Sequence, residues 1–241
     1  GFEPRLSGSY RLNEFSSIKS SYARTRQVIH LLQNSTAGSP IDYWIPSSDI
    51  VKPEYADQVS LGYFRNFKEN TFESSIEVYY KNMSNQVDYR SGTQIILNEM
   101  IEKDLLFGVG RSYGVEFQLR KKEGDFTGWI GYTLSKSERK FDELNKGMWF
   151  NAKQDRTHDV SIVGVWQFSK SLSFSGVWVY YTGDAITWPT GRYVIDGRIV
   201  ESYTERNGDR LPNYHRLDFA LNWTRERKSG FKSILNFSIY N

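Results

Sequence analysis

Hydrophobic and polar side chains alternate along ten segments of the chain. In one of them, Ile76 and Val78 alternate with Glu73 and Glu77. Side chains point alternately to the two faces of a β-strand, so each segment would have one apolar and one mostly polar face. The predicted strands cover approximately residues 3–12, 16–26, 57–67, 72–81, 115–120, 126–135, 160–168, 172–180, 217–223 and 234–240. No stretch longer than a turn has helical periodicity, so the sequence predicts an all-β fold.

The connections between these strands are alternately short and long. Short polar turns lie near residues 13–14, 68–70, 121–125, 169–171 and 225–230, and long connections lie near 27–56, 86–111, 138–158 and 182–213. In an antiparallel up-and-down sheet, this alternation places all tight turns at one end and all long loops at the other. Outer-membrane barrels are built in this way, whereas a Greek-key sandwich mixes both lengths at both ends.

Strand length and aromatic placement also favour a membrane barrel. Several segments reach about ten residues, which is enough for a tilted strand to cross a bilayer, whereas strands of soluble proteins usually have about 5–6. Aromatic residues stand at the ends of the apolar faces, where an aromatic girdle would lie; these are Tyr63, Tyr80, Phe168, Tyr180 and Trp223. We therefore predict an antiparallel up-and-down transmembrane β-barrel. The alternative is a soluble β-domain in which these aromatic residues form the core.

The composition narrows the function classes further. The chain has 16% aromatic residues at a mean hydropathy of -0.58, as expected for strands with one polar face. A formal net charge of +3 with 24% charged residues does not indicate a nucleic-acid partner. Cysteine is absent, which excludes disulfides, thiolate metal sites and a cysteine nucleophile.

Both ends of the chain favour an arc of a larger barrel over a closed ten-strand barrel. Residues 1–4 have no signal-peptide pattern, and the alternating pattern is still running at Tyr240 and Asn241. An open arc would leave two unpaired edges, which a lipid bilayer does not tolerate. We therefore do not expect this segment to insert into a membrane alone.

Six stretches resemble, in the family's order, the barrel of TonB-dependent receptors from Bacteroidetes-type bacteria. They are residues 42–67, 75–92, 108–141, 151–169, 179–193 and 210–223, the last reading RLPNYHRLDFALNW. The resemblance implies that residues 1–241 are part of a barrel of about 22 strands whose lumen holds an N-terminal plug. It also implies that the plug, the segment that contacts TonB and the last strands lie outside this chain.

The resemblance implies a receptor that imports a scarce nutrient across the outer membrane by active transport. The ligand classes left open are an iron chelate, a glycan, a peptide and a cobalamin. The implied partners are outer-membrane lipid, the TonB complex and the ligand, and a surface lipoprotein is a partner by family analogy alone. The alternatives are a passive porin-like or structural barrel without a plug, an outer-membrane hydrolase, and a soluble carbohydrate-binding β-domain.

We expect neither catalysis nor a cofactor. His30, His158 and His215 are far apart and have no metal-ligand spacing, so no metal site is predicted. A GxGxxxG pattern at residues 108–114 opens a predicted strand rather than a helix, so it is not a phosphate-binding loop.

A charged cluster stands where long loops re-enter predicted strands. Its members are Asp155, Arg156 and His158 at one loop base, and Arg210 and His215 at the next. Such a cluster could be read as an acid–base site, but charge pairing that anchors the loops is the interpretation we favour.

Four aromatic residues in the long connections are candidates for ligand binding, because neither lipid nor a core requires them there. They are Trp44, Trp149, Trp188 and Tyr193. Exposed aromatic rings can stack on a sugar or pack on a peptide or siderophore; the alternative is that they pack loop against loop. The polar faces of the strands would line the lumen, with Glu73, Glu77, Glu116, Gln118 and Arg120.

Overall fold

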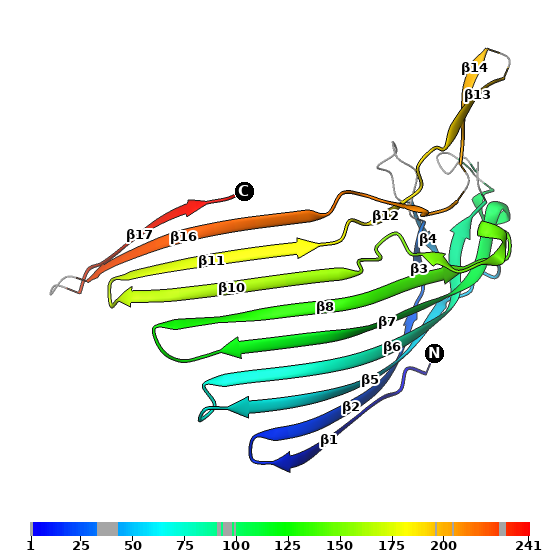
Figure 1. Ribbon diagram of the computed structural model, residues 1–241. Helices are drawn as coiled ribbons and strands as arrows, with labels where there is room; N and C mark the ends of the chain where they lie inside the picture. The colour runs from blue at the N-terminus through cyan, green and yellow to red at the C-terminus, as the bar shows by residue number, and fades with distance from the viewer. Residues whose placement is uncertain are drawn as a thin grey trace.

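The computed structural model describes residues 2–32, 43–90, 93, 98, 100–195, 197–203, 205–226 and 230–241. Ten long antiparallel strands and one short strand form a curved sheet (Figure 1). Each long strand pairs with its neighbours among the long strands along the chain, and the short β9 (Phe150–Asn151) pairs with β8. The long strands are β1 (Arg5–Asn13), β2 (Ser16–Gln27), β5 (Glu54–Phe67), β6 (Phe72–Tyr89), β7 (Leu105–Lys121), β8 (Phe126–Lys140), β10 (His158–Ser169), β11 (Leu172–Tyr181), β16 (Tyr214–Glu226) and β17 (Lys232–Ile239). All ten predicted strands are therefore confirmed, in up-and-down order.

Several strands are longer than the alternation predicted, most clearly β6 and β7. Beyond Tyr80 the positions that continue the apolar face are Asn82 and Ser84, so the apolar pattern ends although the backbone pairing continues. A bulge between Ser84 and Gln86, with Asn85 at φ 57°, then breaks the period of two. Backbone pairing needs no apolar side chains, which is why hydrophobic periodicity underestimated these strands.

The strand register aligns the apolar positions of successive strands on one face of the sheet. One row runs Tyr63, Ile76, Phe117 and Tyr132 across β5 to β8. The opposite face carries polar rows, for example from Glu77 through Glu116 and Thr133 to Asp159. We call the two surfaces the apolar face and the polar face.

The apolar face is exposed and is not a core. Ile76 is 47% exposed and Phe117 is 41% exposed. The buried hydrophobic residues of the described chain lie instead at the loop end. All but Ala152 and Ala185 belong to two clusters: Leu32, Ile45, Val51, Val87, Tyr89, Ile101 and Leu105, and Leu106, Phe141, Leu144 and Phe150. Soluble proteins rarely expose so continuous an apolar surface, so this arrangement does not support the soluble β-domain.

Aromatic side chains flank the apolar face at both ends of the strands. Near the loops, the rings of Tyr80 and Tyr113 stack with centroids 6.3 Å apart. Near the turns, the rings of Trp166 and Phe168 lie 4.8 Å apart. This distribution is the one expected where a lipid-facing surface meets the two membrane–water interfaces.

The alternation of short turns and long loops is confirmed. The tight turn between β5 and β6 uses left-handed backbone at Lys68, Glu69 and Asn70, with φ of 49°, 55° and 69°. The long connections carry small elements of their own: β3 (Ile29–Leu32), β4 (Tyr43–Pro46), η1 (Ile101–Asp104), η2 (Asn145–Gly147), β9 (Phe150–Asn151), β12 (Ala185–Ile186), β13 (Gly191–Ile195), β14 (Arg198–Ser202) and β15 (Asp209–Arg210). The β13–β14 hairpin extends away from the sheet (Figure 1).

The sheet is an open arc. Its two edges are β1 and β17, and within the described residues these strands do not pair with each other. The ten strands therefore do not close on themselves, in agreement with the predicted arc. Among the described residues, none of the helical segments has the length and hydropathy needed to cross a membrane.

Three glycines lie side by side on the apolar face, where Gly128, Gly164 and Gly176 are register partners on β8, β10 and β11. The ring of Phe126 covers Gly164, and a Cβ there would lie 3.2 Å from it. The ring of Phe219 covers Gly176 at the same distance. Large rings thus fill the space beside Gly164 and Gly176, which keeps the surface continuous there.

Candidate functional site

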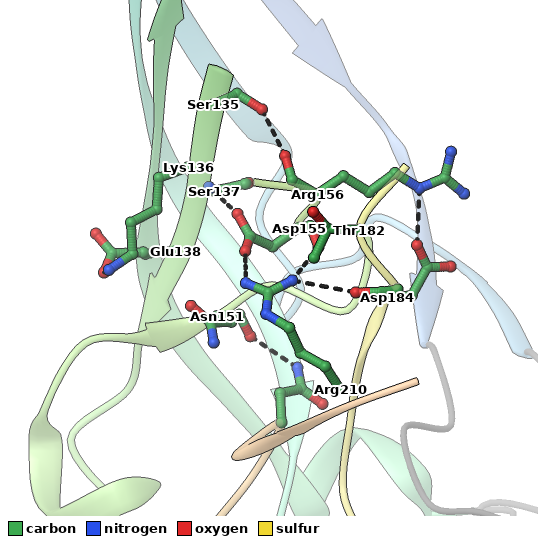
Figure 2. A network of polar contacts seen from close by, with 12 residues as sticks. Ser135, Lys136, Ser137, Glu138, Asn151, Asp155, Arg156, Thr182, Asp184 and Arg210 are labelled. Carbon is green, nitrogen blue, oxygen red and sulfur yellow. Dashed lines mark hydrogen bonds and ion pairs between the residues drawn. The ribbon is translucent and has the colours of Figure 1, made fainter. Parts of the chain in front are cut away.

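The long loops are joined at their bases by a polar network centred on Asp155 (Figure 2). Asp155 is 1% exposed. The backbone N–H of Ser137 on β8 donates to Asp155 Oδ1 at 2.5 Å. The guanidinium of Arg210 on β15 forms an ion pair with Oδ2 of the same carboxylate. Arg210 Nη1 also donates to the carbonyls of Asp155 (2.8 Å) and Gly183 (3.1 Å). Asp155 therefore connects β8 to the loop between β11 and β16.

Arg156 makes a second connection between the same two loops. Its Nε donates to Asp184 Oδ1 at 2.8 Å (Figure 2). Its guanidinium lies 3.8 Å from the centroid of the Tyr181 ring. The hydrogen bond to Asp184 raises the pKa of Arg156 above its ordinary value. The carbonyl of Arg156 accepts from the Ser135 hydroxyl at 2.9 Å. Asp155 and Arg156 therefore do not pair with each other. Their ionic partners, Arg210 and Asp184, both lie in the loop between β11 and β16.

A third connection uses side chains that the sequence did not single out as a site. Asn207 Nδ2 donates to the carbonyl of Asn151 at 2.9 Å, and the backbone N–H of Asn207 donates to Thr187 Oγ1 at 2.9 Å. Buried Arg206 lies over the Tyr89 ring at 4.6 Å and donates to the Tyr89 carbonyl at 2.7 Å. Buried polar groups need such partners, but their identity depends on contacts between loops far apart in the sequence.

The two histidines of the predicted cluster lie elsewhere. His158 begins β10 on the apolar face, and its Nδ1 is 2.9 Å from the Tyr132 hydroxyl. His215 is exposed and is the register partner of Tyr180 on the same face. The structure therefore brings together Asp155, Arg156 and Arg210 but not the histidines. Among the described residues no group of three or more His, Asp and Glu side chains is arranged to hold a metal ion.

The four aromatic candidates come from three different loops. Trp44 on β4 is 60% exposed, Trp188 is 51% exposed, and Tyr193 on the β13–β14 hairpin is 60% exposed. Trp149 is half-buried and packs under the guanidinium of Arg111, which lies 4.2 Å from its ring centroid. Three of the four rings are thus accessible to a ligand, and Trp149 has a packing partner within the chain.

The predicted lumen residues lie on the polar face. Glu77 and Glu116 are direct partners on β6 and β7, and Lys122 Nζ is 2.8 Å from Glu73 Oε1. A shallow cavity of about 380 Å³ is lined by Glu77, Glu116 and Asp159 together with hydroxyl side chains of β8 and β10. This face offers charge and hydrogen-bonding groups to water or to a polar partner.

A comparison with protein families matches residues 1–241 to the model described as "TonB dependent receptor-like, beta-barrel". This chain belongs to that family. Its members are receptors and transporters rather than enzymes, and the match confirms the family that the sequence motifs indicated. The Bacteroidetes-type origin stays a prediction.

Solved receptor structures have the same fold as this TonB-dependent receptor barrel. The ferripyoverdine receptor of the outer membrane of Pseudomonas aeruginosa aligns over 92% of this chain and 27% of its own, with a TM-score of 0.59 and 13% identity. The FrpB iron transporter of Neisseria meningitidis aligns over 99% and 34%, with a TM-score of 0.60 and 16% identity. The ferric-catecholate import receptor Fiu of Escherichia coli K12 aligns over 98% and 34%, with a TM-score of 0.58 and 14% identity.

The chain spans about a third or less of these solved receptors. At such low identities the likeness establishes the fold alone. A comparison with curated protein sequences finds no match.

Proposed function

We propose that the chain is a wall segment of an outer-membrane receptor that imports a scarce nutrient by TonB-dependent active transport. The observation that carries the proposal is the division of one ten-strand arc into an apolar face and a polar face, in a chain that matches the receptor barrel over its whole length. In this proposal the apolar face contacts lipid and the polar face lines the lumen. The full barrel would have about 22 strands and would hold a plug that is not part of this chain.

The orientation in the membrane follows from the connections. The tight turns lie on the periplasmic side and the long loops on the extracellular side, as in other outer-membrane barrels. The network around Asp155 and Arg210 joins two extracellular loops at their bases. Thr187 accepts a hydrogen bond from the backbone N–H of Asn207. This bond at the loop base restricts the position of the neighbouring residue, Trp188. Ligand capture would use Trp44, Trp188 and Tyr193, with Trp149 supporting the loop surface.

An iron chelate is the first ligand class to test. The three structural neighbours are named as a ferripyoverdine receptor, an iron transporter and a ferric-catecholate import receptor. The sequence identity with these receptors is too low to assign their ligands to this chain. Glycans, peptides and cobalamin are therefore tested beside iron chelates. A contact with a surface lipoprotein would be detected by co-purification of the full-length receptor.

The test is uptake by cells that carry the full-length receptor. Cells with and without a functional TonB complex are given radiolabelled iron chelates, oligosaccharides, peptides and cobalamin. The proposal expects accumulation of one class that depends on both the receptor and TonB. Accumulation that needs the receptor but not TonB would contradict active transport and would support a passive porin-like barrel instead.

A further inference from the structure

The apolar face changes character at the loop ends of β2, β5, β6, β7 and β8. Beside and beyond the rings of Tyr80 and Tyr113, the positions that continue this face carry mostly polar and charged side chains. The charged ones are the cations Arg24, Arg26, Arg111, Lys136 and Lys140 and the carboxylates Asp57 and Glu138. We call this set the outer cationic belt, because five cations stand against two carboxylates.

Glu138 holds two cations of the belt close together. The residue is only 5% exposed, its Oε2 is 2.7 Å from Arg111 Nη2, and its Oε1 is 3.0 Å from Lys136 Nζ. The Arg111 guanidinium also lies 4.2 Å from the centroid of the Trp149 ring and 5.8 Å from that of Tyr113. These contacts fix the positions of two neighbouring cations around one carboxylate, so this group keeps an excess positive charge.

The second carboxylate of the belt is paired in the same way. Arg24 donates from Nε to Asp57 Oδ1 and from Nη2 to Asp57 Oδ2, both at 2.8 Å. The Tyr22 hydroxyl donates to the same carboxylate at 2.6 Å. Both carboxylates of the belt are therefore engaged by the belt's own cations. The excess of positive charge remains whichever cation pairs with them.

The belt lies at the depth of lipid headgroups. Ile130 is the middle position of the apolar stretch of β8 and marks the midplane of the bilayer. Lys136 and Glu138 are six and eight residues further along the strand, which places them ~16 Å and ~21 Å from the midplane at the usual rise and tilt. The hydrocarbon core ends at ~15 Å and the headgroup layer at ~20–22 Å. The cations thus begin where the acyl chains end.

The outer surface of the wall stays open to lipid at this point. Lys136 and Glu138 point away from the network around Asp155, which lies on the other side of β8 (Figure 2). Strands that complete the barrel would join the edges β1 and β17, and a plug would lie against the polar face. Neither would cover the outer side of β6, β7 and β8, in the middle of the arc.

We propose that the outer cationic belt binds the phosphate-bearing headgroup of a lipid in the outer leaflet, from outside the barrel. Phosphate oxygens accept strong, charge-assisted hydrogen bonds from guanidinium and ammonium groups, and clusters of Lys and Arg at a membrane surface attract anionic headgroups. The acyl chains would lie on the apolar face below, against residues such as Tyr80 and Val115. The inference rests on the proposed function, which places this face in lipid and the long loops outside the cell.

The experiment is native mass spectrometry of the purified full-length receptor in detergent micelles, titrated with lipid A that carries two phosphate groups. The comparison lipid is the same molecule without its phosphates. We expect retention of the phosphorylated lipid that weakens as the salt concentration rises. The double variant Lys136→Gln/Lys140→Gln should bind it about tenfold or more weakly.

Arg139→Gln is the matched control. Arg139 stands between Glu138 and Lys140 on β8 at the same height, but its position belongs to the polar face, where its register partners are Gly110 and Phe150. Its replacement should change lipid affinity by less than about twofold. The variant Lys136→Arg/Lys140→Arg keeps both charges and should also bind within about twofold of the unchanged receptor.

Equal retention of the two lipids would overturn the proposal, because the phosphate would then contribute nothing. Displacement of the lipid by an equal concentration of inorganic phosphate would also overturn it, since the belt would then be a site for free anions. So would an affinity loss in Lys136→Arg/Lys140→Arg as large as in the Gln variant, which would indicate a structural role. The measurement needs neither TonB nor a nutrient, so its failure is distinguishable from failure of the uptake test.

Discussion

Replacing Ile130 by Arg in the full-length receptor should strongly destabilise the barrel. Ile130 is the middle apolar-face position of β8, whose apolar stretch runs from Phe126 to Leu134, and its register partners are Leu119 and Ile162. Eight residue steps span ~27 Å along a strand, and a tilt of ~40° reduces this to about 21 Å across the membrane. That height is close to the ~25 Å apolar band of outer-membrane barrels, so Ile130 lies near the midplane. An Arg at this depth costs about 2–4 kcal/mol.

The assay is equilibrium unfolding of the full-length receptor from lipid vesicles in urea, with Glu116→Arg as the control. Glu116 lies on the polar face and its register partner is Glu77. An Arg at position 116 would stand beside the negative charge of Glu77, so it should lower the free energy of unfolding far less than an Arg at position 130. Equal costs at the two positions would refute the assignment of the two faces. A cost of less than about 0.5 kcal/mol at Ile130 would show that it does not contact the lipid core.

Three further substitutions test the loop base, the sheet and the ligand site. Arg210→Met leaves the buried carboxylate of Asp155 without its cation; it should destabilise the loop base by about 3 kcal/mol, seen as faster amide exchange between β11 and β16. Gly128→Ala places a methyl group against a carbonyl of β10 and should cost about 1–3 kcal/mol in urea unfolding, whereas Gly8→Ala, whose nearest atom is 3.7 Å away, should cost less. Trp188→Ala should weaken uptake of the transported ligand by roughly tenfold or more without changing the unfolding midpoint; unchanged uptake would place Trp188 outside the ligand site.

The sheet could be predicted because its signal is local. Alternation with a period of two identified all ten strands, and the sequence of short and long connections gave their order. Strand ends could not be predicted where the apolar face stops before the pairing does, as at Asn82 and Ser84 of β6. At the bulge beside Asn85, the alternation of side chains between the two faces is interrupted, and a search for a strict period of two does not find the residues beyond it.

The candidate site could be predicted only in part, because its contacts join loops that are distant in sequence. Charged residues at a loop base indicated Asp155 and Arg210, but their partners could not be chosen without the fold. His158 stands close to Asp155 in sequence, yet the strand that begins there places it on the apolar face beside Tyr132. Buried Arg206 gave no signal, since its partner Tyr89 lies at the far end of β6.

The central claim is that this chain is an arc of a large outer-membrane receptor barrel. The most direct test is the intact mass of the native protein extracted from outer membranes. Scaling 28.1 kDa by the 27–34% share of the solved receptors that the chain spans predicts roughly 80–105 kDa. A native membrane protein of 28.1 kDa would contradict the claim, because ten strands would then have to form the whole molecule.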